Sequence, residues 1–482
     1  MRLRLHLVRM VDQEVWRSAR EEIPEHRAVL VELTADGVSG WGESSDFMAT
    51  TYRSNISTVI NRLRAVEPLL KDADPTQPEQ LWHTLYPVLA DCPFALGALD
   101  VAAHDLAARL AGEPLYRHLG LPDPSGVPSS YSIGLDSPDK MVAKLTRTPG
   151  WSLYKVKLAR AEDLDVVRAL REHTDAPFWL DGNACWTPEG LFKVLDQLAD
   201  LNIAALEQPF PVGEVEAHRE VRRRSPVPIF ADESVTTPDQ VPAAVDQFDG
   251  VNLKVLKAGG LTPILHMVHD CRNKGLATML GCLPESSAGA SAAAHLAGAT
   301  DHVDLDTVAL LATDTGDGVR LTAEGRIVLP DRPGTGFEPD PTRPAWVLRR
   351  LGPEDLRSLG ETWPTAHRVP TADADRALHV AALREGRVIG LATAVPEPAP
   401  FRTATGAVPA WRLCGVLVDP ARRGVGVGTA LVDRVVQELA EPVWCPAAAG
   451  PRPFLDRAGF RQVTGSGTAS DGHLVREGGT AG

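Results

Sequence analysis

The sequence predicts an α/β protein of three domains, the largest of which is a parallel, TIM-like barrel. Three observations lead to this prediction. The chain has 482 residues, more than one compact core usually contains. Two apolar strands and then helices come first, followed by short strands that alternate with helical patterns. A segment rich in proline and glycine precedes a third unit, so the expected domains are residues 1–125, 126–338 and 345–482.

The composition excludes several classes of partner. The 49 Lys and Arg against 63 Asp and Glu give a formal net charge of −14, so we expect small ligands and no nucleic acid or membrane surface.

The first ten residues mix charged and apolar side chains and predict a strand, not a signal peptide. No uncharged run approaches the roughly 20 residues that cross a bilayer, so a cytoplasmic protein is expected. Six scattered cysteines indicate free thiols, and a homo-oligomer is left open.

The first domain is predicted to be α+β. Leu3–Val8 and His26–Asp36 have the apolar pattern of strands. Helical periodicity follows in Ser57–Leu70 and in Leu96–Gly112, where the glycine ends the second helix.

Eight short apolar segments between Val127 and Ile327 predict the barrel. They recur at the spacing of β/α units, which favours a parallel barrel. The predicted strands are Tyr131–Leu135, Leu153–Leu158, Phe178–Asn183, Ala204–Pro209, Ile229–Ser234, Val251–Lys257, Ala277–Cys282 and Val303–Val308.

Three successive barrel strands end in acids, namely Asp181, Glu207 and Asp232. The intervals of 26 and 25 residues are each about one β/α repeat, so the three carboxylates should share one mouth of the barrel. They would repel one another unless a hard cation bound them, and Mg²⁺ suits them because it leaves positions open for water and substrate. One such acid would more often be a helix cap or a surface charge, but three in register favour a metal site.

Lysines flank the acids on both sides. Lys155 and Lys157 precede them at i, i+2 spacing, which sends both amines to the barrel interior. Lys254 follows on the strand after the acids. Burial and nearby cations should lower the pKa of these amines towards values useful for a general base. Lys257 should point the other way if the strand continues.

The ordered motifs K-x-K, D-x-N, E-Q-P, D-E-S and N-x-K resemble the enolase superfamily, specifically its muconate-lactonizing-enzyme-like subgroup. The resemblance covers roughly residues 1–338. It implies an α+β capping domain over a modified (β/α)7β barrel. It also implies Mg²⁺ as a cofactor, held by the three acids, with a lysine base acting next to it.

By the same resemblance, Lys157 and Lys254 are acid–base groups on opposite faces of the substrate, and Lys155 helps neutralise the substrate carboxylate. A proton taken by one lysine and replaced by the other inverts a stereocentre, so racemisation or epimerisation is expected. Asn183 and Glu233 are expected to orient ligands.

The choice of substrate depends on Asp304 and Asp306, which follow the last predicted strand at i, i+2 spacing. They resemble the D-x-D motif with which dipeptide epimerases bind the α-ammonium group of a dipeptide; the alternative is a pair of solvated acids. Glu285 in the segment G-C-L-P-E-S-S also resembles that branch, although its small neighbours equally suit close helix packing.

Loops of the capping domain, around Val15–Arg20 and Phe47–Thr51, should close over the mouth and select the second residue of the substrate. Arg17, Arg20 and Arg53 are candidates to bind an acidic side chain there, although each is more typically a surface arginine.

The third domain has a strand, a glycine-rich turn and a helix, a geometry that aims backbone N–H groups at phosphate. With Phe454–Phe460, it resembles the GNAT N-acetyltransferases over about residues 345–475. The resemblance implies that the acetyl-CoA pyrophosphate lies in the turn containing Arg423, Gly424, Gly426 and Gly428. Leu455 stands where many relatives have a catalytic tyrosine, so acetyl transfer and simple CoA binding both remain open.

The expected function is a Mg²⁺-dependent dipeptide epimerase fused to a GNAT-like domain. An N-acylamino acid racemase or an o-succinylbenzoate synthase is the alternative within the superfamily, since the same metal and lysines serve both. A further alternative is an N-acetyltransferase whose barrel only binds the substrate.

Overall fold

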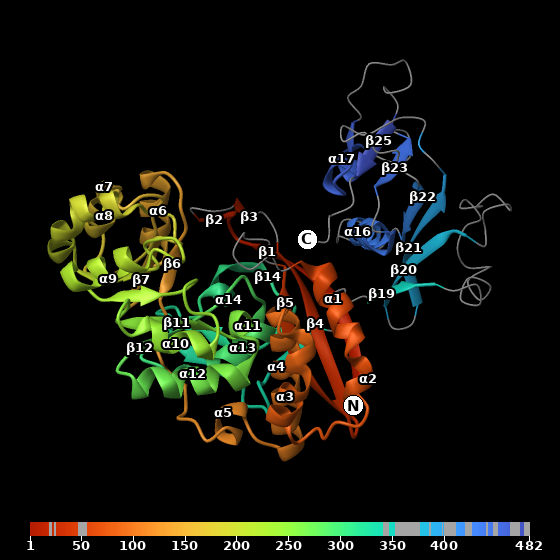
Figure 1. Cartoon of the computed structure of the whole chain (residues 1–482), viewed down its shortest axis with the longest axis horizontal. Coiled ribbons are helices and arrows are strands. Elements are labelled where there is room, and N and C mark those ends of the chain that lie inside the picture. Colours follow the sequence, from red (N-terminus) through yellow and green to blue (C-terminus); the bar gives the residue numbers. More distant parts are fainter. Residues whose placement is uncertain are drawn as a thin grey trace. The chain divides into compact units, whose positions relative to one another are not determined.

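The computed structural model describes residues 1–18, 22–23, 26–46, 55–340, 347–351, 376–384, 387–397, 399, 411–419, 427–439, 442–446, 452–462 and 473–476. The chain forms two compact units, Met1–Arg343 and Pro344–Gly482, both drawn in Figure 1. Their secondary structure confirms the predicted α/β fold class.

The N-terminal unit begins with an antiparallel sheet. Its strands lie in the order β14 (Leu311–Thr313), β1 (Arg2–Asp12), β4 (His26–Ala35) and β5 (Val38–Ser45). Asp36 and Gly37, both at positive φ, join β4 to β5 as a two-residue hairpin turn requires. A short hairpin, β2 (Trp16–Arg17) and β3 (Glu22–Ile23), extends from the end of β1. The two predicted strands are confirmed, and β5 is an additional one.

Helices cover this sheet. They are α1 (Ile56–Ala65), α2 (Glu67–Leu70), α3 (Pro78–Leu89), α4 (Pro93–Ala111) and α5 (Leu115–His118). The alanine-rich α4 packs closely on β5, where a Cβ at Gly42 would lie 2.1 Å from the carbonyl oxygen of Ala98, so only glycine fits there. Gly112 ends α4 in the left-handed conformation, as predicted.

The barrel consists of eight parallel strands, and each of the eight predicted segments overlaps one of them. Each strand is hydrogen-bonded to the next in the order β6 (Tyr131–Ile133), β7 (Tyr154–Lys157), β8 (Phe178–Asp181), β9 (Ile203–Glu207), β10 (Ile229–Ala231), β11 (Gly250–Lys254), β12 (Ala277–Gly281) and β13 (His302–Asp304). Ser130 N donates to Val303 O at 2.9 Å, which brings the two edges together in a nearly closed barrel.

Helices surround these strands in Figure 1. They are α6 (Pro138–Arg147), α7 (Leu164–Arg171), α8 (Pro188–Val194), α9 (Val215–Arg224), α10 (Val241–Ala244), α11 (Val255–Ala258), α12 (Leu261–Asn273), α13 (Ser287–Ala294) and α14 (Thr307–Leu310). Alternation along the strands separates two environments. Phe178 and Leu180 belong to the large apolar core, whereas Trp179 packs with Phe230 and Met279 in a separate cluster.

The C-terminal unit contains a seven-stranded sheet. Its order is β19 (Val347–Arg350), β20 (Leu378–Arg384), β21 (Arg387–Pro396), β22 (Trp411–Val418), β23 (Val443–Pro446), β25 (His473–Arg476) and β24 (Arg461–Gln462). The chain passes from β22 through α16 (Val427–Leu439) to β23, which pairs with β22 in parallel. The short helix α17 (Arg452–Arg457) follows. Arg423, Gly424 and Gly426 lie outside the described residues, and Gly428 lies in the first turn of α16.

The cysteines agree with a further expectation. All six cysteines are free thiols. In the part of the chain that the structure describes, no helix combines the length and the apolar character needed to cross a membrane.

Asp100 joins α4 to the barrel and predicts a pH effect on stability. Its buried carboxylate accepts hydrogen bonds from Thr262 N at 2.9 Å and Thr262 Oγ1 at 2.8 Å. Burial outweighs these bonds and raises the pKa of Asp100 to about 7. The folded state therefore keeps a proton that the unfolded state releases, so this contribution to stability is lost as pH rises from about 4 through 7. Relative to wild type, Asp100→Asn should gain about 1 kcal/mol between pH 6 and pH 8.

Urea unfolding of the full chain at the two pH values measures this difference. Asp72→Asn, at an exposed aspartate, is the control and should show no such gain. An Asp100→Asn variant whose stability follows that of wild type across the range would contradict the assignment.

Candidate active site

Five neighbouring strands carry charged side chains to one mouth of the barrel. They are Lys155 and Lys157 on β7, Asp181 on β8, Glu207 on β9, Asp232 just after β10, and Lys254 on β11. The strand register pairs Lys157 with Asp181, and Asp181 with Glu207. All six side chains are buried. The structure thus brings together the acids and lysines that the sequence singled out.

Lys155 lies among carboxylates. Its Nζ is 2.9 Å from Glu207 Oε1, 2.9 Å from Asp304 Oδ2 and 3.2 Å from Asp181 Oδ2. Burial alone would lower the pKa of Lys155, but Asp304, Glu207 and Asp181 raise it well above its ordinary value. Lys155 is therefore a fixed positive charge in the mouth.

The other two lysines pair with the outer acids of the series. Lys157 Nζ donates to Asp181, and Lys254 Nζ donates to Asp232 Oδ2 at 2.7 Å. Burial lowers the pKa of Lys254, but the Asp232 carboxylate raises it above the ordinary value. The expectation that burial and neighbouring cations would lower the pKa of these amines is wrong for Lys155 and Lys254, because the effect of the adjacent carboxylates is larger.

Lys257 also reaches the acids, contrary to the expectation that it points away. Strand β11 ends at Lys254, and the short helix α11 turns Lys257 back to the mouth. Its Nζ lies 2.8 Å from Asp232 Oδ1 and 2.7 Å from Asp232 O. Gly259 and Gly260, both at positive φ, are the sequence signal for this turn, since successive glycines end a helix.

Two neutral groups hold Glu207. Trp179 Nε1 donates to its Oε2 at 2.8 Å, and Asn252 Nδ2 donates to its Oε1 at 2.8 Å. Burial, followed by the charge of Asp181, raises the pKa of Glu207. Burial acts in the same direction on Asp181, but Lys157 and Lys155 lower its pKa well below the ordinary value. Sequence reasoning assigned no role to Trp179 or to Asn252.

The donor set fits Mg²⁺ in kind. Asp181, Glu207 and Asp232 supply hard carboxylate oxygens from neighbouring strands, and Mg²⁺ prefers such ligands together with water. The buried Oδ1 of Asn183 has no hydrogen-bond partner among the described residues, and water on a bound cation would offer it a donor. Within the described part of the chain, no three His, Cys, Asp or Glu side chains already stand in a metal-binding arrangement. Instead, the ammonium groups of Lys155, Lys157 and Lys254 donate hydrogen bonds to Glu207, Asp181 and Asp232.

Asp304 and Asp306 lie beside the mouth in different environments. Asp304 ends β13 and accepts from Ser130 Oγ at 2.5 Å as well as from Lys155. Asp306 lies beyond the strand, at the start of α14, and accepts from Ser132 N at 2.6 Å. The expectation that both acids share one strand face is wrong because β13 ends at Asp304. Burial and the charge of Asp304 raise the pKa of Asp306 to about 7.

Glu285 follows β12 and is buried. Its Oε2 accepts from Leu283 N at 3.1 Å. Burial and the neighbouring Glu43 raise the pKa of Glu285 to about 8.

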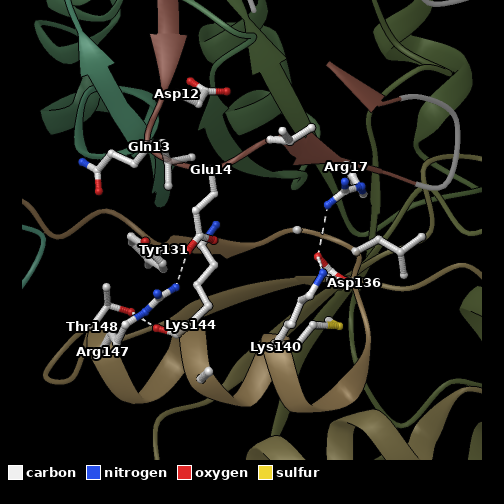
Figure 2. Close-up of a pocket in the computed structure, with 16 residues that line it drawn as sticks. Asp12, Gln13, Glu14, Arg17, Tyr131, Asp136, Lys140, Lys144, Arg147 and Thr148 are labelled. Atoms are coloured by element: carbon white, nitrogen blue, oxygen red, sulfur yellow. Dashed lines mark hydrogen bonds and ion pairs between the residues drawn. The ribbon is translucent and has the colours of Figure 1, made fainter. Parts of the chain in front are cut away.

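A pocket of about 670 Å³ adjoins this region, between the segment after β1 and the helix α6 (Figure 2). Arg17 Nη1 lies 3.1 Å from Asp136 Oδ2 on its rim. Tyr131, which lines the pocket, directly precedes Ser132, whose N–H holds Asp306. Of the capping-loop candidates, Arg17 lines this pocket. Arg20, Arg53 and residues 47–51 lie outside the described part of the chain.

Three family models match the chain. The mandelate racemase / muconate lactonizing enzyme N-terminal domain matches residues 7–120, and the enolase C-terminal domain-like family matches residues 140–343. The acetyltransferase (GNAT) family matches residues 348–460.

Named relatives match about two thirds of the chain. L-Ala-D/L-amino acid epimerase of Flavobacterium johnsoniae is 37% identical over 318 residues, which are 66% of this chain and 94% of that protein. Dipeptide epimerase of Methylococcus capsulatus, solved with Mg and L-Arg-D-Lys, has 30% identity and a TM-score of 0.65, over 70% of this chain and 98% of its own. Dipeptide epimerase of Enterococcus faecalis V583, solved with Mg and L-Leu-L-Tyr, has 27% identity and a TM-score of 0.67, over 70% and 99%. The chain therefore belongs to the enolase superfamily and carries a GNAT-family domain after its barrel.

Proposed function

We propose that the protein is a Mg²⁺-dependent dipeptide epimerase, which inverts the carbon next to the carboxylate of a dipeptide. The observation that carries this proposal is the placement of Lys157 and Lys254 at opposite ends of the carboxylate series, with Lys155 among the acids. Relatives named epimerases, and neighbouring structures that contain Mg and a dipeptide, support it. The proposed domain boundaries are residues 1–125, 126–338 and 345–482.

Asp181, Glu207 and Asp232 would hold the metal ion. A bound Mg²⁺ would supply positive charge beside the substrate carboxylate, which gains a second negative charge when the α-proton leaves. Lys155 adds a second fixed charge on that side, because the surrounding carboxylates keep it protonated. Both charges favour removal of a very weakly acidic proton.

Lys157 and Lys254 would perform the proton transfer from two sides. One amine accepts the α-proton as the C–H bond breaks, and the other ammonium donates a proton as a new C–H bond forms on the opposite face. The number of protons and electrons is conserved, so no redox partner is needed.

Asp304 and Asp306 would bind the α-ammonium group of the first residue of the dipeptide. Glu285 is hydrogen-bonded to Thr307, the residue after Asp306, and Tyr131, which lines the pocket, directly precedes Ser132, which binds Asp306. An N-acylamino acid or an o-succinylbenzoate precursor has no ammonium group at that place. The acid pair therefore favours a free dipeptide over those alternatives.

The C-terminal domain would bind acetyl-CoA. Arg423, Gly424, Gly426 and Gly428 would hold its pyrophosphate at the start of α16, where backbone N–H groups favour an anion. Leu455 is buried and supplies no acid or base, so acetyl transfer has no assigned catalytic residue.

The function predicts proton exchange in free dipeptides. The full chain with Mg²⁺ in D₂O should replace the α-proton of the second residue of L,L-dipeptides and invert its configuration. N-acetyl and N-succinyl amino acids should not exchange, because they lack the ammonium group. ¹H NMR with a panel of both substrate types measures this. Exchange confined to N-acyl substrates would sink the proposal and favour the racemase.

The two lysines predict complementary defects. Lys157→Ala and Lys254→Ala should each lower epimerisation by about 10²–10⁴-fold, the usual contribution of a general acid or base. Each variant should still exchange the α-proton of one epimer only, and that epimer should differ between the two, because each retains the lysine on one face. Lys274→Ala, at an exposed lysine, should behave as wild type. Loss of exchange in the same epimer in both variants would refute the two-face assignment.

A further inference from the structure

A carboxylate of the capping sheet bonds directly to the barrel beside the ammonium subsite. Glu43 on β5 is 1% exposed. It accepts hydrogen bonds from Ser286 N at 2.9 Å, from Gly289 N at 3.0 Å, and from Ser286 Oγ. These donors lie at the start of α13, where free N–H groups favour negative charge. Glu43 therefore fixes the junction between β12 and α13.

Thr307 joins this junction to the acid pair. Its Oγ1 donates to Glu285 O at 2.8 Å and accepts from Glu285 N at 3.3 Å. Glu285 directly precedes Ser286, and Asp306 directly precedes Thr307. A continuous relay of hydrogen bonds and peptide bonds therefore runs from Glu43 in the capping domain to Asp306.

Gln13 contacts the C-terminal end of α14, the helix that begins at Thr307. Its Nε2 donates to Ala309 O at 3.1 Å and to Leu311 O at 3.3 Å, and its backbone N donates to Leu310 O at 2.8 Å. The capping domain thus contacts α14 at its C-terminal end through Gln13 and at its N-terminal end through the Glu43 relay. On the barrel side, Ser132 N is bonded to the Asp306 carboxylate at 2.6 Å.

We infer that Glu43 and Thr307 are positioning residues for the ammonium subsite, so that the capping domain sets the place of Asp306 and with it the affinity for the first residue of the substrate. The inference rests on the proposed function in that the ligand of Asp306 is an α-ammonium group. Neither Glu43 nor Thr307 contacts the lysines that move the proton. Their loss should therefore change KM and leave kcat nearly unchanged.

A matched pair of variants at Thr307 tests the relay. Thr307→Val keeps the shape of the side chain and removes both hydrogen bonds, whereas Thr307→Ser keeps the hydroxyl. For a free L,L-dipeptide, Thr307→Val should raise KM about five-fold, the worth of one ordinary hydrogen bond, with kcat changed less than about two-fold. Thr307→Ser should restore the wild-type KM, which a purely steric role of the methyl group would not predict.

Glu43→Gln tests the start of the relay in the same assay. The substitution replaces one of the two carboxylate oxygens, which together accept from Ser286 N, Ser286 Oγ and Gly289 N, with an amide group that cannot accept. It should raise KM by a similar factor. Because both residues act on Asp306 through one relay, the double variant Glu43→Gln/Thr307→Val should be no worse than the more affected single variant. If Glu43→Gln does not fold, the Thr307 pair still decides the matter.

The outcomes separate this inference from the proposed function. A wild-type chain that exchanges no dipeptide proton overturns both. A wild-type chain that exchanges, together with a Thr307→Val variant of wild-type KM, overturns only the relay. A fall in kcat at unchanged KM, an additive double variant, or a Thr307→Ser variant that behaves like the valine also overturns it.

Discussion

The barrel mouth depends on the mutual neutralisation of buried ammonium and carboxylate groups. Four lysines reach the mouth, and each has a carboxylate within hydrogen-bond distance. Lys155 contacts Glu207 and Asp304, and Lys157 contacts Asp181. Lys254 and Lys257 both contact Asp232. An isolated charge at such a depth would be very costly, and removing one partner of a buried pair leaves the other uncompensated. The parallel strands satisfy this constraint because their carboxyl ends all meet at one edge. The same arrangement places Lys157 and Lys254 at opposite ends of the carboxylate series.

The capping domain contributes to this site through contacts distant from the lysines. Glu43 and Gln13 hold the two segments that follow β12 and β13, and those segments carry Glu285 and Asp306. The pocket along α6 has one wall from the capping domain and one from the barrel (Figure 2). In the proposed function, both domains would therefore contribute to substrate recognition, whereas the proton transfer would belong to the barrel alone.

Much of this arrangement is readable from the sequence because it follows from regular repeats. Acids at intervals of 26 and 25 residues indicate successive β/α units, and an i, i+2 pair of lysines on a strand must share one side. These rules place Lys155, Lys157 and the three acids without knowledge of any contact. The rules fail where a strand ends. They assign Lys257 and Asp306 to strands, whereas Lys257 lies in α11 and Asp306 lies at the start of α14.

Contacts between distant segments are not encoded in such patterns. The hydrogen bonds of Trp179 and Asn252 to Glu207, and of Glu43 to Ser286, join residues 28, 45 and 243 positions apart. The sign of the pKa shift of Lys254 likewise depends on the distance to one carboxylate, which composition cannot supply.

The measurement that tests the charge-balanced metal site most directly is an anomalous difference map from crystals of the full chain soaked in Mn²⁺, a cation that carboxylates bind as they bind Mg²⁺. The account predicts one strong peak at about 2.0–2.2 Å from an oxygen of each of Asp181, Glu207 and Asp232, with the lysine ammonium groups moved off the coordinating oxygens. A map with no peak there, or with a peak bound by other residues while the same preparation epimerises dipeptides, would contradict it.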